Sequence, residues 1–475
     1  MESLTKVLEA IDGVVWGIPL IVLIMGTGIY LTIRLGVLQF RKLGKALKYM
    51  VKNEEGASGE VTSFGALCTA MAATIGTGNI VGVATAVIAG GPGALFWMVI
   101  AACFGMATKY SEGLLAVKFR EQKSDGRFLG GPFRYIEQGM GPRWKWLAKL
   151  FAIFGVGAGL LGIGTITQVN GIASAVKNVF DPETQNTVEL FGTDYSWATV
   201  IAAVVVALFT ALVVIGGLQR IASVTSIVVP FMAIAYVIVC VSILIYNIEK
   251  LPHAVVTVVQ GAFGIRAVSG GALGALLLAM QKGVARGIFS NESGLGSAPI
   301  AAAAAQTHEP VRQGLVSMTG TFIDTVVICT MTGLSIMVTG AYDFSTANGL
   351  DGVDVTIWAF SNGLPWAAGV GSIILMVCLA LFAFTTILGW DYYSERCLEY
   401  LSGGRMGIVK VYRWLYILAV LIGPFLTLSA VWTLADIMNG LMAIPNLIAL
   451  VALSGIIVAE TKSYFKRLEN GEIQG

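Results

Sequence analysis

Apolar residues form long runs along most of the chain, and short polar stretches separate these runs. A helix that crosses the roughly 30 Å hydrocarbon core of a bilayer needs about 20 mainly apolar residues. The pattern therefore predicts an all-α, polytopic membrane protein. Eleven spanning helices are expected, at about residues 14–34, 63–89, 93–117, 149–177, 196–217, 222–246, 264–284, 314–340, 366–391, 412–432 and 437–460.

Composition supports this interpretation and excludes several classes of protein. Only 12% of the 475 residues are charged and 56% are apolar, whereas about 25% are charged in an ordinary soluble domain. Lipid must therefore cover much of the surface. The net charge of +2 gives no strongly charged face for nucleic acid. Six isolated cysteines, with no CxxC motif, and two histidines do not favour a metal centre or a disulfide framework.

The distribution of lysine and arginine predicts the orientation in the cell membrane, because cytoplasmic loops are enriched in these residues. Basic residues gather after the predicted first, third, ninth and eleventh spans, whereas residues 181–195 and 341–354 contain none. The N-terminus is therefore expected outside and the C-terminus in the cytoplasm.

Eleven spans divide as one plus ten, and ten helices suit two five-helix repeats of opposite orientation, a common plan for secondary transporters. One membrane domain is expected. An extra helix and a basic loop (1–62) precede a first repeat (63–250), a second repeat (251–461) and a short tail (462–475).

The second predicted span contains a weak point in its middle, formed by Gly76, Thr77, Gly78 and Asn79. Glycine costs about 1 kcal/mol relative to alanine inside a helix, so the helix unwinds most easily here. Backbone groups freed in this way must face protein, water, ions or a ligand. Small residues also allow close packing between membrane helices, but an asparagine at mid-membrane depth favours a binding site.

The first helix of the second repeat is expected to contain a matching break. If Lys282 and Arg286 mark the cytoplasmic surface, the midplane of the seventh span falls on Ser269, Gly270 and Gly271. The alternatives are a merely kinked helix, or a break in the following polar segment at Ser290 and Asn291.

Polar side chains inside other apolar runs are further candidates. Gln168 is expected to face the bundle interior, where it bonds a substrate carboxylate or ties two helices together. The adjacent hydroxyls of Thr385 and Thr386 point about 100° apart, so both are not readily satisfied by their own helix. Asp324 lies deep in the eighth span, where a carboxylate is expensive and suggests a cation or proton pathway. No lysine or arginine is expected at its depth, although a structural ion pair is the alternative.

Three stretches carry a family resemblance: GTGN (76–79), GGPGALFWMVIAACFG (90–105) and GVARGIFSNESGLGSAPIAAAAA (283–305). They resemble the alanine or glycine:cation symporter family, along nearly the whole chain. The resemblance implies a five-plus-five inverted repeat behind one extra helix, and sodium- or proton-coupled carriage of alanine and glycine. By comparison with sodium-coupled neurotransmitter transporters, it also implies a sodium site from the carbonyls of Ala72, Ile75 and Phe382 and the hydroxyls of Thr385 and Thr386, with Asp324 near a second cation site.

The sequence therefore predicts a symporter and not an enzyme. Sodium is expected as the coupling ion, and L-alanine, glycine or D-alanine as the substrate. A proton-coupled carrier that uses Asp324 is the main rival. A channel is disfavoured because polar groups concentrate near the midplane. An enzyme is disfavoured because the chain has no HExxH motif and only His253 and His308.

Overall fold

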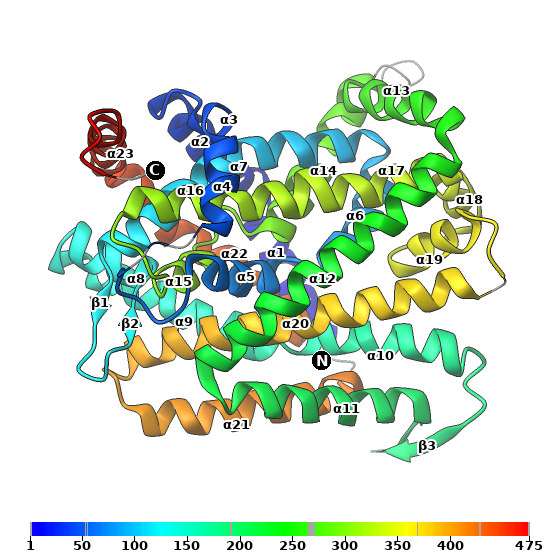
Figure 1. Cartoon of the computed structure of the whole chain (residues 1–475). Helices are drawn as coiled ribbons and strands as arrows, with labels where there is room; N and C mark the ends of the chain where they lie inside the picture. Colours follow the sequence, from blue (N-terminus) through cyan, green and yellow to red (C-terminus); the bar gives the residue numbers. More distant parts are fainter. Residues whose placement is uncertain are drawn as a thin grey trace.

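The computed structural model describes residues 2–52, 54, 56–190, 192–264, 271–367, 369–426 and 429–473. The helices form a bundle in which the long ones run side by side (Figure 1). Through the first half they are α1 (Glu2–Val15), α2 (Ile18–Arg34), α3 (Leu38–Arg41), α4 (Leu43–Val51), α5 (Ser63–Thr74), α6 (Val83–Gly90), α7 (Gly93–Lys118), α8 (Pro132–Arg134), α9 (Lys145–Leu161), α10 (Ile166–Phe180), α11 (Trp197–Val214) and α12 (Gly217–Tyr246). Through the second half they are α13 (Leu251–Ala262), α14 (Ala272–Asn291), α15 (Ala298–Ala302), α16 (Pro310–Thr321), α17 (Thr330–Thr339), α18 (Ala341–Asn348), α19 (Val353–Asn362), α20 (Val370–Leu401), α21 (Met406–Ile422), α22 (Ser429–Ala452) and α23 (Ser454–Glu469).

Within the described residues, ten helical stretches are long and apolar enough to cross a membrane. An eleventh is added when α5 and the segment 78–90 are counted as one span, bent by 55°. The predicted all-α architecture with about eleven spans is thus confirmed. Four spans differ in detail. The predicted fourth is divided into α9 and α10, and the predicted seventh lies further along the chain, as α14. The predicted tenth and eleventh lie several residues earlier, at Met406–Phe425 and Thr433–Ala452, and residues 454–460 belong to α23.

Short elements connect the spans. The sequence pattern did not predict α13, α18 or α19, which lie between spans. Two antiparallel hairpins are also present. One pairs β1 (Glu121–Gln122) with β2 (Phe128–Leu129), and the other pairs β3 (Thr187–Leu190) with β4 (Thr193–Ser196). In Figure 1, β1, β2, α8, α15 and α23 lie at one end of the bundle, and α13, α18 and β3 lie at the other.

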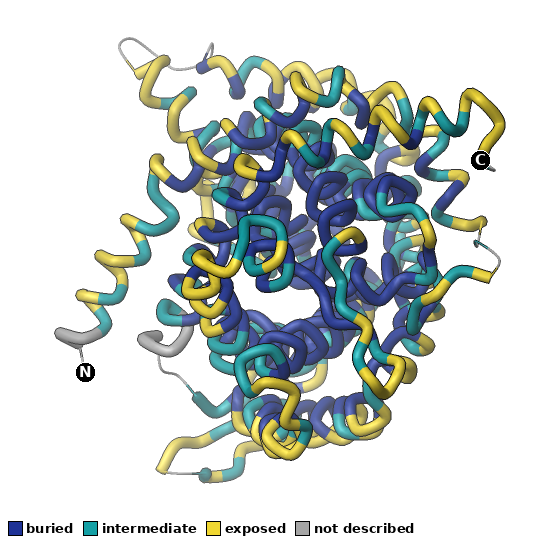
Figure 2. The backbone as a smooth tube through the Cα atoms, turned by 90° about the vertical axis from the view of Figure 1, so that its left-hand side faces the viewer, coloured by how far each residue is buried: buried dark blue, intermediate teal, exposed yellow. Residues whose placement is uncertain are grey.

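Burial separates an inner core from an apolar outer surface. Seen along the bundle, buried backbone fills the centre and exposed backbone forms the rim (Figure 2). Large apolar side chains lie exposed on the rim, among them Ile201 of α11, Phe231 of α12 and Trp414 of α21. Because water would penalise such a surface, these helices face lipid.

The ends of α5 and α15 are joined at the end of the bundle that carries α23. Val61 and Ala305 form a parallel β-bridge, in which Glu60 N–H donates to the Ala304 carbonyl at 2.8 Å and Gln306 N–H donates to the Val61 carbonyl at 2.8 Å. The guanidinium of Arg120 reinforces the joint through the carbonyls of Ser58, Ala303, Ala305 and Thr307. The start of α5 is thus attached to the segment that follows α15.

Candidate functional site

The second span is interrupted where the glycines predicted it. Helix α5 ends at Thr74, and the chain resumes as a π-helical turn, Gly78–Gly82, before α6. The fully buried side chain of Asn79 closes the break, since its Oδ1 accepts the Gly76 N–H at 2.9 Å. Its Nδ2 donates to the Asp324 carboxylate at 2.7 Å. The expected weak point is therefore real, and Asn79 holds its shape.

Asp324 lies in a π-helical stretch, Phe322–Cys329, between α16 and α17. Besides Asn79, its buried carboxylate accepts hydrogen bonds from Ser290 Oγ at 2.9 Å and Thr325 Oγ1 at 2.6 Å. Among the described residues, no basic group forms an ion pair with it within 4.0 Å. Contrary to expectation, a lysine reaches this region: the Nζ of the buried Lys109 donates to the carbonyl of Glu292, two residues beyond Ser290.

The matching break lies near the end of α14, at the alternative position and not at the expected one. Helix α14 ends at Asn291, and Glu292 adopts a left-handed φ of 55°, which a side chain with a Cβ rarely takes. An ideal Cβ on Gly78 would be 3.5 Å from the Ser290 Cα, so the two breaks face each other. Gly294 also has a positive φ, 92°, and the chain becomes helical again in α15.

Gly271 therefore takes no part in this arrangement. It is exposed at the start of α14, roughly 28 Å along the helix axis from Ser290. Ser269 and Gly270 lie outside the described residues. The expectation failed because Lys282 does not mark the basic face: its Cβ lies 2.8 Å from an ideal Cβ on Gly90, at the far end of the second span.

Buried charges that the sequence analysis missed brace the break after α14. Lys109 Nζ donates to the Glu292 carbonyl at 3.2 Å, and the Glu292 carboxylate accepts the Trp390 Nε1–H at 3.0 Å. Glu112 accepts the Gly294 N–H at 3.1 Å and Asn446 Nδ2 at 2.6 Å. The signal was present in the sequence, since KYSEG (109–113) interrupts the apolar pattern of the third span.

Oxygen atoms gather on the other side of Gly76, where α20 approaches α5. Gly389 allows this approach, since an ideal Cβ there would be 2.7 Å from the Ala73 nitrogen. Thr385 Oγ1 and Thr386 Oγ1 both donate to the Phe382 carbonyl, each at 3.0 Å, and Thr386 Oγ1 also donates to the Ile75 carbonyl at 3.5 Å. The expectation that their own helix does not satisfy both hydroxyls was therefore wrong, because one carbonyl of α20 accepts from both. Hard cations prefer oxygen ligands, so this donor set fits sodium.

Ala72, the remaining expected sodium ligand, is fully buried on the last turn of α5. Gly76, which lies in the break, adjoins the oxygen cluster, because an ideal Cβ at Gly76 would lie 2.5 Å from Thr386 Oγ1. A side chain at position 76 would therefore occupy the space beside the threonine hydroxyl.

Gln168 faces Gly76 from the start of α10. Its Nε2 donates to the Ile163 carbonyl at 3.0 Å, which satisfies a group freed by the interruption between α9 and α10. Its buried Oε1 has no hydrogen-bond partner among the described residues and would be 3.4 Å from a Cβ on Gly76. The unused oxygen is an acceptor, so it suits a donor such as an ammonium rather than a carboxylate. Thr77 instead packs against α10 beside Gly171.

A cavity of about 230 Å³ lies next to the break and is lined by charged side chains of both signs, which form no ion pair within 4.0 Å among the described residues. Asp12 of α1 and Asp436 of α22 face Lys282 and Arg286 of α14 across it. Phe289 lines the same cavity and would be 3.6 Å from a Cβ on Gly78. Phe289 therefore lies between the cavity and the break at Gly78.

Comparison with known proteins identifies the family of this chain. The profile of the sodium:alanine symporter family matches residues 1–474. The chain belongs to this family. An uncharacterized transporter of Haemophilus influenzae is 54% identical over 468 residues, which cover 98% of this chain and 97% of the relative. The sodium/alanine symporter AgcS of Methanococcus maripaludis is 44% identical over 463 residues, 97% of each chain. The probable sodium/glutamine symporter GlnT of Bacillus subtilis is 37% identical over 481 residues, 98% of this chain and 93% of the relative.

The fold of this sodium:alanine symporter family member also matches a solved transporter. The crystal structure of MhsT in complex with L-phenylalanine aligns with a TM-score of 0.54 at 14% identity, over 86% of this chain and 99% of that one. At this identity the likeness establishes the fold alone. The protein is a multi-pass membrane transporter with the five-plus-five architecture behind one extra helix, and not an enzyme, as the sequence predicted.

Proposed function

We propose that the protein couples sodium entry to the uptake of a small neutral amino acid by alternating access. The observation that carries this proposal is the oxygen cluster of Ile75, Phe382, Thr385 and Thr386 directly beside the break at Gly76. A cation and a substrate at these two places would share one unwound segment. Relatives named as sodium/alanine and probable sodium/glutamine symporters support the choice of ion.

The amino acid is placed between the two broken spans. Its carboxylate lies at the N-terminal end of the π-helical turn that begins at Gly78, where the helix dipole favours an anion. Its ammonium faces the free Gln168 Oε1 and the end of α14 at Ser290. Sodium binding orders the segment 75–79, and a substrate that needs the same order binds more tightly, so each favours the other.

The oxygen cluster is tested by the double substitution Thr385→Ala/Thr386→Ala. We expect it to raise the sodium concentration for half-maximal uptake in proteoliposomes at least tenfold, while the folded yield stays near that of the parent. Ser394→Ala is the matched control, because Ser394 lies further along α20, away from the Ile75 carbonyl, and donates to the Trp390 and Asp391 carbonyls of its own helix. An unchanged sodium dependence in the double variant would remove these threonines from the site.

A proton-coupled carrier is the second candidate, and Asp324 is the observation in its favour. This buried carboxylate has no ion pair within 4.0 Å among the described residues and contacts both breaks through Asn79 and Ser290. Replacing sodium with choline at fixed pH separates the two candidates. Sodium coupling predicts that uptake collapses, with Asp324 as a second cation ligand. Uptake that persists without sodium and follows an imposed proton gradient would assign the coupling to Asp324.

The substrate is expected to be small, since Gly78 and Ser290 bring the two breaks close together, with Phe289 beside them. One methylene changes apolar binding by about 1–3 kcal/mol, so glycine and both enantiomers of alanine are expected to fit. Competition against labelled L-alanine by glycine, D-alanine, serine, glutamine, leucine and phenylalanine measures this. Strong competition by leucine or phenylalanine contradicts the small site, and preferred uptake of glutamine would place the substrate range with that of GlnT.

A further inference from the structure

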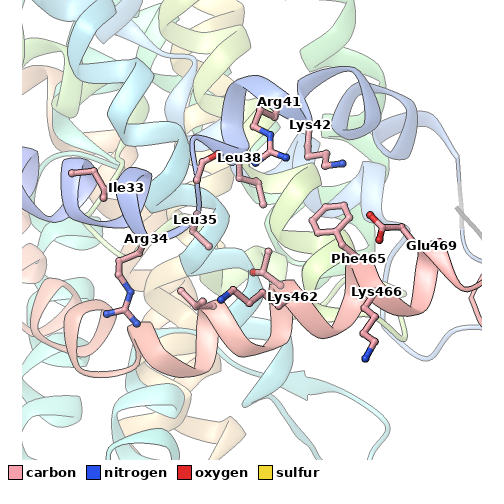
Figure 3. A pocket seen from close by; sticks show the side chains of 13 residues that line it. Ile33, Arg34, Leu35, Leu38, Arg41, Lys42, Lys462, Phe465, Lys466 and Glu469 are labelled. Atoms are coloured by element: carbon pink, nitrogen blue, oxygen red, sulfur yellow. Dashed lines mark hydrogen bonds between the residues drawn. The ribbon is translucent and has the colours of Figure 1, made fainter.

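A pocket of about 450 Å³ opens where the end of α2, α3 and the terminal helix α23 meet (Figure 3). It lies apart from the transport site, on the end of the bundle that carries the basic loops. Helix α23 crosses the direction of the long helices there (Figure 1). Two tyrosines fix its position: Tyr30 of α2 contacts Ser454 Oγ at 3.0 Å, and Tyr49 of α4 contacts Tyr464 at 2.9 Å, both through their hydroxyls.

Charge in this pocket is strongly unbalanced. Five basic side chains and one acidic side chain line it: Arg34, Arg41, Lys42, Lys462, Lys466 and Glu469. Among the described residues, none of the six forms an ion pair within 4.0 Å. The crowding extends to Lys45 on α4, since burial, and then the charges of Lys42 and Lys48, lower the pKa of Lys45. The pocket therefore attracts an anion.

Neighbouring basic residues on the same face are neutralised. Lys118 pairs with Glu460 at 2.5 Å, and Arg467 pairs with Glu309 at 2.7 Å. Both carboxylates come from elements that adjoin the pocket, so acidic partners are available nearby but do not reach the five cations. Cytoplasmic loops are generally rich in basic residues, which explains why many lysines and arginines lie on this face. It does not explain why five of them without an ion pair line one pocket.

The remaining wall is apolar and continues onto a lipid-facing surface. Ile33, Leu35, Leu38, Val458 and Phe465 line the pocket. Ile29 and Ile33, 39% and 72% exposed, extend the apolar surface along α2, which is part of a membrane-spanning helix. A free phosphate would use only the cations, whereas a phospholipid would also place acyl chains along α2.

We propose that this pocket binds the headgroup of an anionic phospholipid from the leaflet on that side. The phosphate lies between the two walls, with Arg41 and Lys42 on one and Lys462 on the other, while Lys466 lines the edge of the pocket and its side chain points away from Arg41 and Lys42 (Figure 3). Arg34 sits at the lipid end, held by its hydrogen bond to Tyr30 at 2.8 Å. Basic pockets between helices on the cytoplasmic side are typical sites for such headgroups. The lipid would join the extra N-terminal span to the C-terminal helix.

Lipid binding to the purified full-length protein tests this. Native mass spectrometry is carried out on delipidated protein titrated with phosphatidylglycerol or phosphatidylcholine of identical acyl chains. We expect the parent to bind the first phosphatidylglycerol at least tenfold more tightly. Lys462→Gln/Lys466→Gln, two exposed positions on α23, should abolish most of this preference, and Arg41→Gln on the opposite wall should reduce it in the same direction.

The matched control is Arg143→Gln/Lys149→Gln, which removes the same charge from two exposed positions, just before α9 and in its first turns, that form no ion pair within 4.0 Å among the described residues. It should retain the preference. Equal binding of the two lipids by the parent would overturn the proposal, and so would an equal loss in the control, which would indicate a diffuse basic face. Displacement of phosphatidylglycerol by millimolar inorganic phosphate would also overturn it, since the pocket would then take a free anion. Because the experiment measures lipid binding and not amino acid uptake, a negative result would not contradict the proposed symport.

Discussion

At the scale of single residues, Gly76 joins the two halves of the transport site. The position that a Cβ would take at Gly76 lies beside both the Thr386 hydroxyl and the Gln168 Oε1. Gly76→Ala would place a Cβ 2.5 Å from Thr386 Oγ1, so we expect both sodium and substrate binding to fall at least tenfold. Isothermal titration of each ligand on purified protein measures this. Gly82→Ala is the control, because an ideal Cβ at Gly82 has no neighbour within 4 Å. If both variants bind normally, the two ligands do not meet at Gly76.

Gln168 offers a second test, because its Oε1 is buried without a partner among the described residues. A hydrogen bond to a charged group contributes about 1.5–3 kcal/mol, so Gln168→Ala should weaken amino acid binding roughly 10- to 100-fold. Asn170→Ala is the control, since that amide donates to the Ile166 and Gly423 carbonyls instead. Affinity measured in detergent, with the folded fraction determined by gel filtration, gives the comparison. Normal binding by the Gln168 variant would make that amide a packing group.

The sequence predicts those site residues that stand out within a single span, and not the pairings between residues of different spans. Gly76, Gly78 and Asn79 stand out because glycine and a buried amide are both unfavourable in an apolar helix. Lys109 and Glu112 carry an equally local signal, but their partners Glu292 and Asn446 lie in distant spans. No single-span pattern indicates that pairing.

At the scale of helices, close packing of α14 against α7 holds the second break in place. An ideal Cβ on Gly283 would be 2.2 Å from the Ala94 carbonyl oxygen, so the two backbones cannot accommodate it without moving apart. Overpacking of this kind costs about 1–3 kcal/mol. Gly283→Ala should therefore lower the thermal unfolding midpoint in detergent by several degrees. Gly274→Ala, where an ideal Cβ meets nothing within 4 Å, should be neutral or slightly stabilising. A Gly283 variant as stable as the Gly274 control would contradict this packing.

The position of α14 in the bundle could not be predicted from the sequence. Lys282 and Arg286 look like a cytoplasmic border because basic residues usually mark one. They lie instead in a cavity shared with Asp12 and Asp436, which come from helices far away in the chain. Only tertiary packing creates such a polar interior. The break of α5 needed no such information, because its glycines mark it locally.

At the scale of the whole molecule, the orientation in the membrane remains a prediction. Charge bias places β3 outside and the start of α9 in the cytoplasm. Glu189→Cys and Arg143→Cys, both at exposed positions, test this with a membrane-impermeant maleimide on intact cells. We expect labelling at position 189 only. Five of the six native cysteines are buried and the sixth, Cys103, is only partly exposed, so background should be low. Labelling at position 143 alone would invert the topology.

The joint between Val61 and Ala305 sets a condition on how fast the protein can work. Three backbone hydrogen bonds hold the two strands together, the Val61 N–H contact to Ala304 at 3.2 Å included, and Arg120 bonds to both strands, so parting them also breaks at least one of its hydrogen bonds. At about 1 kcal/mol each, separating the two strands in every cycle would add several kcal/mol to the activation barrier, or three or more orders of magnitude in turnover. A fast carrier with this joint must therefore move α5 and α15 together, with its hinges at the two breaks.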